Sequence, residues 1–299
     1  MTLKIESVTR TFGKTIAINN LSLDIPQNQI YGFLGANGAG KTTMFRLILG
    51  LLSPNLGKIS WDGHPIDYSF SNQVGYLPEE RGLYPKLTVK EQLLYFGQLR
   101  GMNKQAINEK LEYWLDQFHI SEYLNRKLEE LSKGNQQKIQ FITSIINSPK
   151  LLLLDEPFSG LDPVNVELLK DAVVSIAKQG TTIVFSSHRM EHVEELCENL
   201  CILHHGNPIL QGNLQEIKST YRKKNIIIHT DLELDYLNNL NEVSKIKKIN
   251  QGYIIQVTDS RILQDILKDI ISKGTITKFS LEEPSLNDIF IEKVGASYE

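Results

Sequence analysis

The sequence has 299 residues, of which 41% are hydrophobic and 22% charged, and its formal net charge at pH 7 is −3. This composition is near the globular average and excludes a largely disordered chain, and the length suffices for two domains. The negative charge gives no general attraction to nucleic acid, so no nucleic-acid partner is expected. We expect neither a membrane-spanning helix nor a signal peptide, because no apolar run of about 18 residues and no basic-then-apolar start occurs. Cys197 and Cys201 predict buried thiols in a reducing compartment.

The chain begins with predicted strands and a glycine-rich turn. Residues 3–12 and 16–25 alternate between apolar and polar side chains, which predicts two half-buried strands. Residues 29–35 are an apolar run that leads into glycines and predict a buried strand. Residues 42–52 have the periodicity of a helix that ends near Pro54. KISWDG and QVGYLP predict further short strands.

A helical block and more strand–helix pairs follow. Residues from about 88 to 147 predict an inserted helical subdomain, and LLLLDEP and TTIVFSSH predict short apolar strands that are each followed by a helix. LCILHHGNPILQG predicts a hairpin that turns at Gly206-Asn207. Strands that alternate with helices predict an α/β fold with a mostly parallel sheet and an antiparallel β portion at the start. We expect this domain to span residues 1–220.

The remaining residues, 221–299, predict a small second domain. Arg222, Lys223 and Lys224 predict a solvated linker. The order of expected elements behind them is β-α-β-β-α-β with one more helix at the end, where LDYLNNL is the first helix. This order predicts an α+β ferredoxin-like accessory domain. Its expected role is either to stabilise a dimer or to sense cargo or an ion. His204, His205 and His229 are not expected to form a metal site.

A glycine-rich loop predicts a triphosphate site. Residues 35–42 read GANGAGKT, which matches G-x-x-x-x-G-K-[ST] between a predicted strand and a predicted helix. Glycines let the backbone N–H groups surround the phosphates, and the helix directs its positive end at them. Lys41 is expected at the β and γ phosphates, and the Thr42 hydroxyl at Mg²⁺. The predicted ATP phosphate-binding residues are Gly35, Asn37, Gly38, Ala39, Gly40, Lys41, Thr42 and Thr43.

Two acidic residues end a later apolar strand. Asp155 and Glu156 follow the run LLLL, an arrangement that resembles a Walker B segment. A buried strand that ends in this way places Asp155 near Mg²⁺. Glu156 is then the candidate general base for the attacking water, a role that typically contributes a rate factor of roughly 10²–10⁴.

Four further features carry a resemblance to the ABC ATPases, which covers residues 3 to about 218. LSKGNQQ at 131–137 resembles the LSGGQ signature of that family, and SGLD at 159–162 resembles its D-loop. His188 resembles the switch histidine, and Phe12 resembles the aromatic residue that stacks on adenine. All of these features stand in the order that the family uses.

The resemblance implies a mechanism and partners. Two cassettes pair head-to-tail around two Mg-ATP, as a homodimer or a heterodimer. Ser132, Lys133, Gly134 and Asn135 act in trans on the partner's ATP, and Asp162 lies in the D-loop. His188 contacts the γ-phosphate and, with Glu156, is predicted to be catalytic. Polytopic transmembrane subunits hold such an ATPase at the cytoplasmic face of the membrane. The expected contact surface is the part of the helical block from about 88 to 130, because Glu79 lies between the phosphate site and that part.

The sequence also departs from the family pattern. Glu79 stands where the family has a glutamine that touches Mg²⁺, and its carboxylate remains a possible Mg²⁺ ligand. Lys133 and Asn135 replace a glycine and a glutamine of the signature. With PEERGLYP and SLNDIFIE, these features resemble ATP-binding subunits of bacterial exporters of the sodium-extrusion type. They leave the cargo open.

Three other functions remain to be distinguished from a transporter ATPase. A soluble ABC factor acting on ribosomes has two fused cassettes, whereas one is found here. A chromosome or repair ATPase contains long coiled coils, and no sustained heptad pattern occurs. A regulatory module that does not hydrolyse ATP is disfavoured by Glu156.

Overall fold

The computed structural model describes residues 2–66, 68–80, 82–221 and 223–295. The chain divides into two compact units, Met1–Gly212 and Asn213–Glu299. This division lies before the predicted boundary at 220, because helix α7 (Leu214–Thr220) belongs to the second unit. The Asn213 side chain caps that helix by accepting from two of its backbone N–H groups. Among the described residues, no helix is long and apolar enough to cross a membrane.

The first unit contains a four-stranded antiparallel sheet in the order β2-β1-β4-β5. Its strands are β1 (Thr2–Phe12), β2 (Thr15–Pro26), β4 (Leu56–Trp61) and β5 (His64–Pro65). Alternate residues of β2 are buried, as the alternating sequence predicts. Their apolar side chains share a core with helix α1 (Lys41–Ile48), which begins directly after the glycine-rich loop.

The central sheet has six strands in the order β10-β9-β3-β8-β7-β6. Four neighbouring pairs, from β9 through β3, β8 and β7 to β6, are parallel. The strands are β3 (Ile30–Leu34), β6 (Val74–Leu77), β7 (Leu151–Asp155), β8 (Thr182–Ser187), β9 (Asn199–His204) and β10 (Asn207–Asn213). Because carboxyl ends of parallel strands meet at one sheet edge, β3, β7 and β8 deliver their following residues to the same place.

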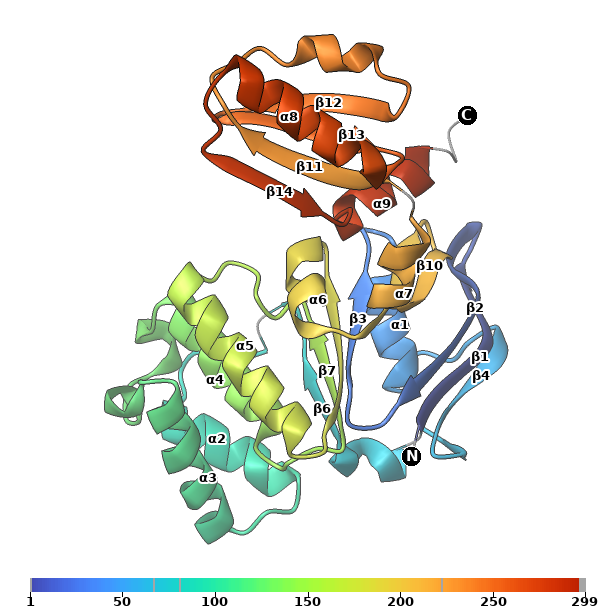
Figure 1. The fold of residues 1–299 in the computed structure, drawn as a ribbon. Coiled ribbons are helices and arrows are strands. Elements are labelled where there is room, and N and C mark those ends of the chain that lie inside the picture. Colours follow the sequence, from blue (N-terminus) through green and yellow to red (C-terminus); the bar gives the residue numbers. More distant parts are fainter. Residues whose placement is uncertain (1, 67, 81, 222, 296–299) are drawn as a thin grey trace. The chain divides into compact units, whose positions relative to one another are not determined.

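The predicted helical block consists of α2 (Val89–Leu99), α3 (Lys104–Gln117), the 3₁₀ segments η2 (Ser121–Tyr123) and η3 (Leu128–Glu130), and α4 (Lys133–Ile145). Outside this block, the first unit also contains the 3₁₀ segment η1 (Tyr68–Gln73) and the helices α5 (Pro163–Lys178) and α6 (Met190–Leu196). Thr88 and Glu91 form a capping box at α2, and Asn103 and Ser132 cap α3 and α4. Within this unit, Figure 1 shows α2 to α5 on the opposite side from β1, β2 and β4.

The second unit is a four-stranded antiparallel sheet in the order β12-β13-β11-β14. After α7, its elements are β11 (Lys224–His229), η4 (Asp235–Asn239), β12 (Val243–Ile249), β13 (Gly252–Val257), η5 (Ser260–Ile262), α8 (Leu263–Lys273), β14 (Lys278–Glu282) and α9 (Leu286–Gly295). Helix α8 and the segment η4 bury apolar side chains in a core with those of β11 and β13.

Two local expectations for this unit were wrong. The predicted first helix is the short 3₁₀ segment η4. Its N-cap residue Leu234 and its residue Leu237 are buried three residues apart, the spacing of a 3₁₀ turn. The predicted linker is partly ordered. Lys224 starts β11, and the Lys223 ammonium lies 3.1 Å from the Glu292 carboxylate. Arg222, the third residue of that expectation, lies outside the described residues.

Candidate functional site

The glycine-rich loop joins the end of β3 to the start of α1. Gly40 caps α1 with φ of 110°, and Gly35 has φ of 156°. A Cβ on Gly40 would lie 2.4 Å from the carbonyl oxygen of Ala17, and one on Gly35 would lie 2.6 Å from that of Leu203. Both positions therefore require glycine, and the loop is held closely between β2 and β9.

Lys41 and Thr42, the first residues of α1, direct their side chains back toward the loop and the sheet edge. The Lys41 ammonium donates to the carbonyl oxygen of Gly35 across 2.7 Å. The Thr42 hydroxyl donates to Asp155 Oδ2 across 2.8 Å. The fully buried strand β7 thus places its last residue beside the first turn of α1.

Ser186 of β8 links the two acidic residues. The register of the parallel pair sets Asp155 opposite Ser186. The Ser186 hydroxyl donates to Asp155 Oδ1 across 2.5 Å and accepts from the backbone N–H of Glu156 across 3.0 Å. Glu156 has φ of 49°, a left-handed conformation that costs a non-glycine residue roughly 1 kcal/mol. Ser186 therefore fixes both the Asp155 carboxylate and the backbone at Glu156.

The Glu156 carboxylate is buried and has the Lys41 ammonium and the His188 imidazole as neighbours. His188, which follows β8, donates from Nδ1 to Glu156 Oε2 across 2.9 Å. The Lys41 ammonium lies 3.3 Å from Glu156 Oε1. The ion pair balances this oxygen electrostatically, although no described hydrogen bond reaches it. Three residues far apart in sequence thus form one connected charge network.

Tyr76 of β6 borders this network. Burial, with a smaller contribution from the nearby Asp155 carboxylate, raises the pKa of the Tyr76 phenol to about 12. The phenol therefore stays protonated at neutral pH and keeps a hydrogen to donate.

The loop faces a cavity of about 590 Å³. Its lining includes Glu79, which the sequence predicted, and His205, which it did not. The other lining residues are Thr15, Ile16, Ala17 and all positions from Ala36 to Thr43. Phe12 is not among the described residues that line the cavity. Its ring is 46% exposed at the end of β1, and the Arg10 guanidinium lies 4.6 Å from the ring centre.

The hairpin between β9 and β10 places His205 at this cavity. The Gly206 N–H donates to the carbonyl oxygen of Ala39 across 3.0 Å, which joins the hairpin to the phosphate loop. The Asn19 N–H donates to the carbonyl oxygen of Gly206 across 2.9 Å. The side chains of Asn19 and Asn207 also pair across 2.9 Å. These bonds hold the exposed His205 imidazole beside the loop.

The signature and the D-loop lie next to each other at the starts of α4 and α5. The Ser132 side chain accepts from the Asn135 N–H across 3.3 Å, and Asp162 accepts from the Asn165 N–H across 3.1 Å. Hydrogen bonds from the backbone and the side chain of Asn165 lower the pKa of the Asp162 carboxyl group. The four signature residues are not among the described lining of the cavity. They are Ser132, Lys133, Gly134 and Asn135.

The loop that carries Glu79 is fastened to the helical block. The Gln140 amide of α4 donates to the carbonyl oxygens of Pro78 across 3.2 Å and Glu80 across 3.1 Å. Gln92 of α2 accepts from the Tyr84 N–H across 3.2 Å. A displacement of this loop would therefore be transmitted to α2 and α4 through these hydrogen bonds.

The donor atoms present fit Mg²⁺ and a triphosphate. Mg²⁺ prefers hard oxygen ligands and is usually held by one or two carboxylates together with substrate phosphates. The Thr42 hydroxyl and the Asp155 carboxylate provide such oxygens side by side. Within the described residues, no group of three or more His, Cys, Asp or Glu forms a protein-only metal site.

Comparisons with known proteins identify the family. A family model described as "ABC transporter" matches residues 18–159, and one described as "ATP-binding protein DrrA1-3-like, C-terminal domain" matches residues 212–294. A Bacillus subtilis (strain 168) protein, named uncharacterized ABC transporter ATP-binding protein YhaQ, is 58% identical over 297 residues, 99% of this chain and 100% of YhaQ. The chain belongs to the ABC transporter ATP-binding proteins.

Two further similarities agree with this assignment. ABC transporter ATP-binding protein NatA of the same organism is 36% identical over 214 residues, 70% of this chain and 87% of NatA. A solved structure described as "Structure of ATP binding subunit of ABC transporter" has a TM-score of 0.69 and 27% identity, and covers 74% of this chain and 93% of that one. The predicted family, the α/β cassette fold and the ATPase activity are thus confirmed.

The structure of this ABC ATP-binding subunit adds residues that motif reasoning missed. Ser186 lies in a strand that is buried along its whole length, so only the register with β7 reveals its two hydrogen bonds. The sequence predicted the hairpin of His205 but not that it packs on the phosphate loop. Gln140 lies in the predicted helix after the signature, and its amide marks how that helix holds the Glu79 loop.

Proposed function

We propose that this subunit hydrolyses ATP in an exporter, as one of two cassettes that close around two Mg-ATP. The carrying observation is the network that joins Lys41, Glu156 and His188 beside the Thr42–Asp155 pair. It supplies one complete half of an ATP site. The signature residues lie away from the cavity, so a second cassette, identical or different, is needed to complete it.

Each side chain has a distinct role in this proposal. The loop N–H groups and Lys41 bind the phosphates, and Thr42 and Asp155 hold Mg²⁺, which supplies charge neutralisation when bound. Glu156 accepts a proton from the attacking water, and His188 orients its carboxylate. Ser132 and the Gly134 N–H would contact the γ-phosphate on the partner cassette. Phe12 remains the proposed adenine platform.

Glu79 gives the proposed site an unusual charge. Its carboxylate lines the phosphate cavity, where it would repel a triphosphate that lacks a metal. We expect Glu79→Gln to tighten the binding of ATP in the absence of Mg²⁺ more than it tightens Mg-ATP binding. Equal changes in the two dissociation constants would show that Glu79 does not face the metal.

The proposed membrane-partner surface lies on the helical block and on the loop directly before it. Tyr84, Tyr95 and Leu99 are exposed by 49%, 43% and 60%, and the rings of Tyr84, Tyr95 and Phe96 pack on one another. Exposed aromatic side chains mark interaction surfaces. Because the loop from Glu79 leads to Tyr84, nucleotide state has a physical route to this surface. Through it the subunit would act at the cytoplasmic face of the membrane.

The test is steady-state ATP hydrolysis and sedimentation of the purified chain. Glu156→Gln should lower turnover by about 10²-fold or more while ATP binding persists. With Mg-ATP, this variant should accumulate as a dimer. Lys41→Ala should prevent both binding and dimer formation. Wild-type turnover in the Glu156→Gln variant would refute the assignment of the base. Export is supported by the resemblance to exporters of the sodium-extrusion type.

A further inference from the structure

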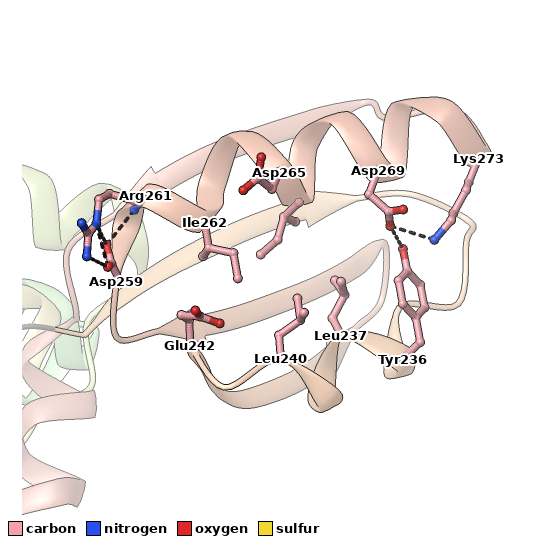
Figure 2. Close-up of a pocket in the computed structure, with 11 residues that line it drawn as sticks. Tyr236, Leu237, Leu240, Glu242, Asp259, Arg261, Ile262, Asp265, Asp269 and Lys273 are labelled. Atoms are coloured by element: carbon pink, nitrogen blue, oxygen red, sulfur yellow. Dashed lines mark hydrogen bonds and ion pairs between the residues drawn. The ribbon is translucent and has the colours of Figure 1, made fainter.

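The second unit contains a groove of about 800 Å³ between α8 and the segment from Tyr236 to Glu242 (Figure 2). Its existence follows from the unequal elements on this face of the sheet. Helix α8 has 11 residues, whereas η4 has 5. At about 1.5 Å and 2.0 Å per residue, the first is about 16 Å long and the second about 10 Å. The shorter segment leaves one side of α8 uncovered.

The floor of the groove is apolar. Leu237 and Ile266 are buried in the core of the unit, at 3% and 2% exposure. Leu240 and Tyr236 border the groove with 37% and 38% of their surfaces exposed, and Ile262 points from the start of α8 toward the same space (Figure 2). A floor of this kind is the receiving surface for the apolar face of an amphipathic helix.

The two cations at the groove are neutralised by their own neighbours. At one end, Lys273 and the Tyr236 hydroxyl both donate to Asp269 Oδ2, across 2.8 Å and 2.5 Å. At the other end, the Arg261 guanidinium donates to both oxygens of Asp259 across 2.5 to 3.1 Å. Both cations are thus paired within the lining, which holds four carboxylates and two cations.

Two carboxylates of the lining remain without such a partner. Within the described part of the chain, no ion pair or side-chain hydrogen bond reaches the carboxylates of Glu242 and Asp265. Glu242 lies on the η4 side of the groove and Asp265 on α8 (Figure 2). An occupant with an apolar face and positive charges along its edges matches this surface.

We propose that the groove binds a basic amphipathic helix from a cytoplasmic segment of the transmembrane subunit. Cytoplasmic segments of membrane proteins carry an excess of Lys and Arg, which is the charge that Glu242 and Asp265 select. The bound helix takes the space beside α8 that a longer first helix would have filled. The origin of the helix in a transmembrane subunit rests on the proposed function. Its apolar and basic composition follows from the lining of the groove alone.

The first experiment measures fluorescence anisotropy of a labelled peptide with the full chain. The probe is a helical peptide with Leu on one face and Lys on the other, and its comparison peptide has Glu in place of Lys. We expect the Lys peptide to bind at least about tenfold more tightly at low ionic strength, and added salt to reduce this difference. Equal affinity of the two peptides would overturn the charge argument.

Charge-reversal variants test whether the peptide binds in the groove. E242K/D265K should weaken the binding of the Lys peptide by at least about tenfold, because two attractive contacts become repulsive. D231K/E282K reverses two exposed carboxylates outside the groove and should change the affinity less than about threefold. Unchanged binding in E242K/D265K would overturn the proposal. Binding of dodecyltrimethylammonium, but not of the peptide, would also overturn it, because the groove would then belong to small amphiphiles.

A crosslink tests the source of the helix. A photoreactive amino acid in place of Leu240, in cells that make the assembled transporter, should join this chain to its transmembrane subunit. A crosslink to a second copy of this chain, or none, would overturn the proposal. E242K/D265K and the control D231K/E282K should both keep wild-type ATP hydrolysis by the purified chain. If the wild-type chain does not hydrolyse ATP, the proposed function is refuted. The peptide-binding measurements would still decide whether the groove binds a basic amphipathic helix.

Discussion

Replacement of Ser186 by alanine tests how the site holds its two acidic residues. The Ser186 side chain is inaccessible to solvent, so its loss removes the 2.5 Å bond to Asp155 and the 3.0 Å bond from Glu156 N–H. A hydrogen bond to a charged group is worth about 1.5–3 kcal/mol, and one between neutral groups about 1 kcal/mol. We therefore expect Ser186→Ala to lower the free energy of unfolding by about 2 to 4 kcal/mol.

The larger effect should be on turnover. Without Ser186, the left-handed backbone at Glu156 loses the bond that opposes its strain, and Asp155 keeps only its contact with Thr42. A catalytic group displaced by about 1 Å loses about 10²-fold in rate. We expect kcat for ATP hydrolysis to fall by about 10- to 100-fold, and the Mg²⁺ concentration for half-maximal rate to rise. The dissociation constant for ATP should change little.

Two measurements check this reasoning: ATP hydrolysis titrated with Mg²⁺ and with ATP, and denaturant unfolding of the same samples. Ser144→Ala is the matched control, because this buried hydroxyl bonds only within helix α4, to the carbonyl oxygen of Phe141, in the described hydrogen bonds. A Ser186→Ala variant that keeps kcat and Mg²⁺ dependence within about twofold of the wild type would refute a positioning role. The lower free energy of unfolding would then be the only effect of the substitution.

Three further predictions concern the cavity and the core. Gly40→Ala should abolish ATP binding measured by calorimetry, because the added Cβ would lie 2.4 Å from the Ala17 carbonyl oxygen. In the control variant Gly82→Ala the added Cβ has no neighbour within 4 Å, so ATP binding should be unchanged. His205→Ala should weaken ATP binding by about tenfold, because the imidazole lines the cavity and would lose one hydrogen bond to the charged nucleotide. An unchanged dissociation constant would exclude a contact between His205 and ATP. Burial lowers the pKa of His192 from its usual 6.5, so the unfolded chain takes up the proton first. Stability should fall as pH drops from 6.5 toward the lowered folded-state pKa, and His192→Gln should flatten this dependence in denaturant titrations.

The parts of the site that phosphate chemistry dictates were readable from the sequence. Glycine at 35 and 40 is required by backbone geometry, so spacing alone located the loop. Asp155 and Glu156 were readable only together with this loop, because an apolar strand that ends in two acids is by itself usually a strand end that meets solvent. The structure places Glu156 beside Lys41 and Asp155 beside Thr42, while their roles in catalysis and Mg²⁺ binding stay predictions.

What the sequence could not reveal depends on register and on packing between distant segments. Ser186 matters because β7 and β8 pair with Asp155 opposite it, and no local pattern encodes that pairing. His205 reaches the cavity only because Gly206 bonds to Ala39. The length of η4 was overestimated, since LDYLNNL has a helix-like apolar spacing that also suits a 3₁₀ turn. The groove beside α8 was therefore not foreseen.

The network of Lys41, Glu156 and His188 suggests a hypothesis for how nucleotide binding would prepare the proposed base, Glu156. The Lys41 ammonium is shared between loop carbonyl oxygens and the Glu156 carboxylate. Entering phosphates compete for this ammonium, because they carry more negative charge than one carboxylate. We therefore expect Lys41 to turn to the phosphates, so that Glu156 Oε1 would lose its ion pair and could accept from water while His188 still held Oε2. In this hypothesis the proposed phosphate-binding residue releases the proposed general base.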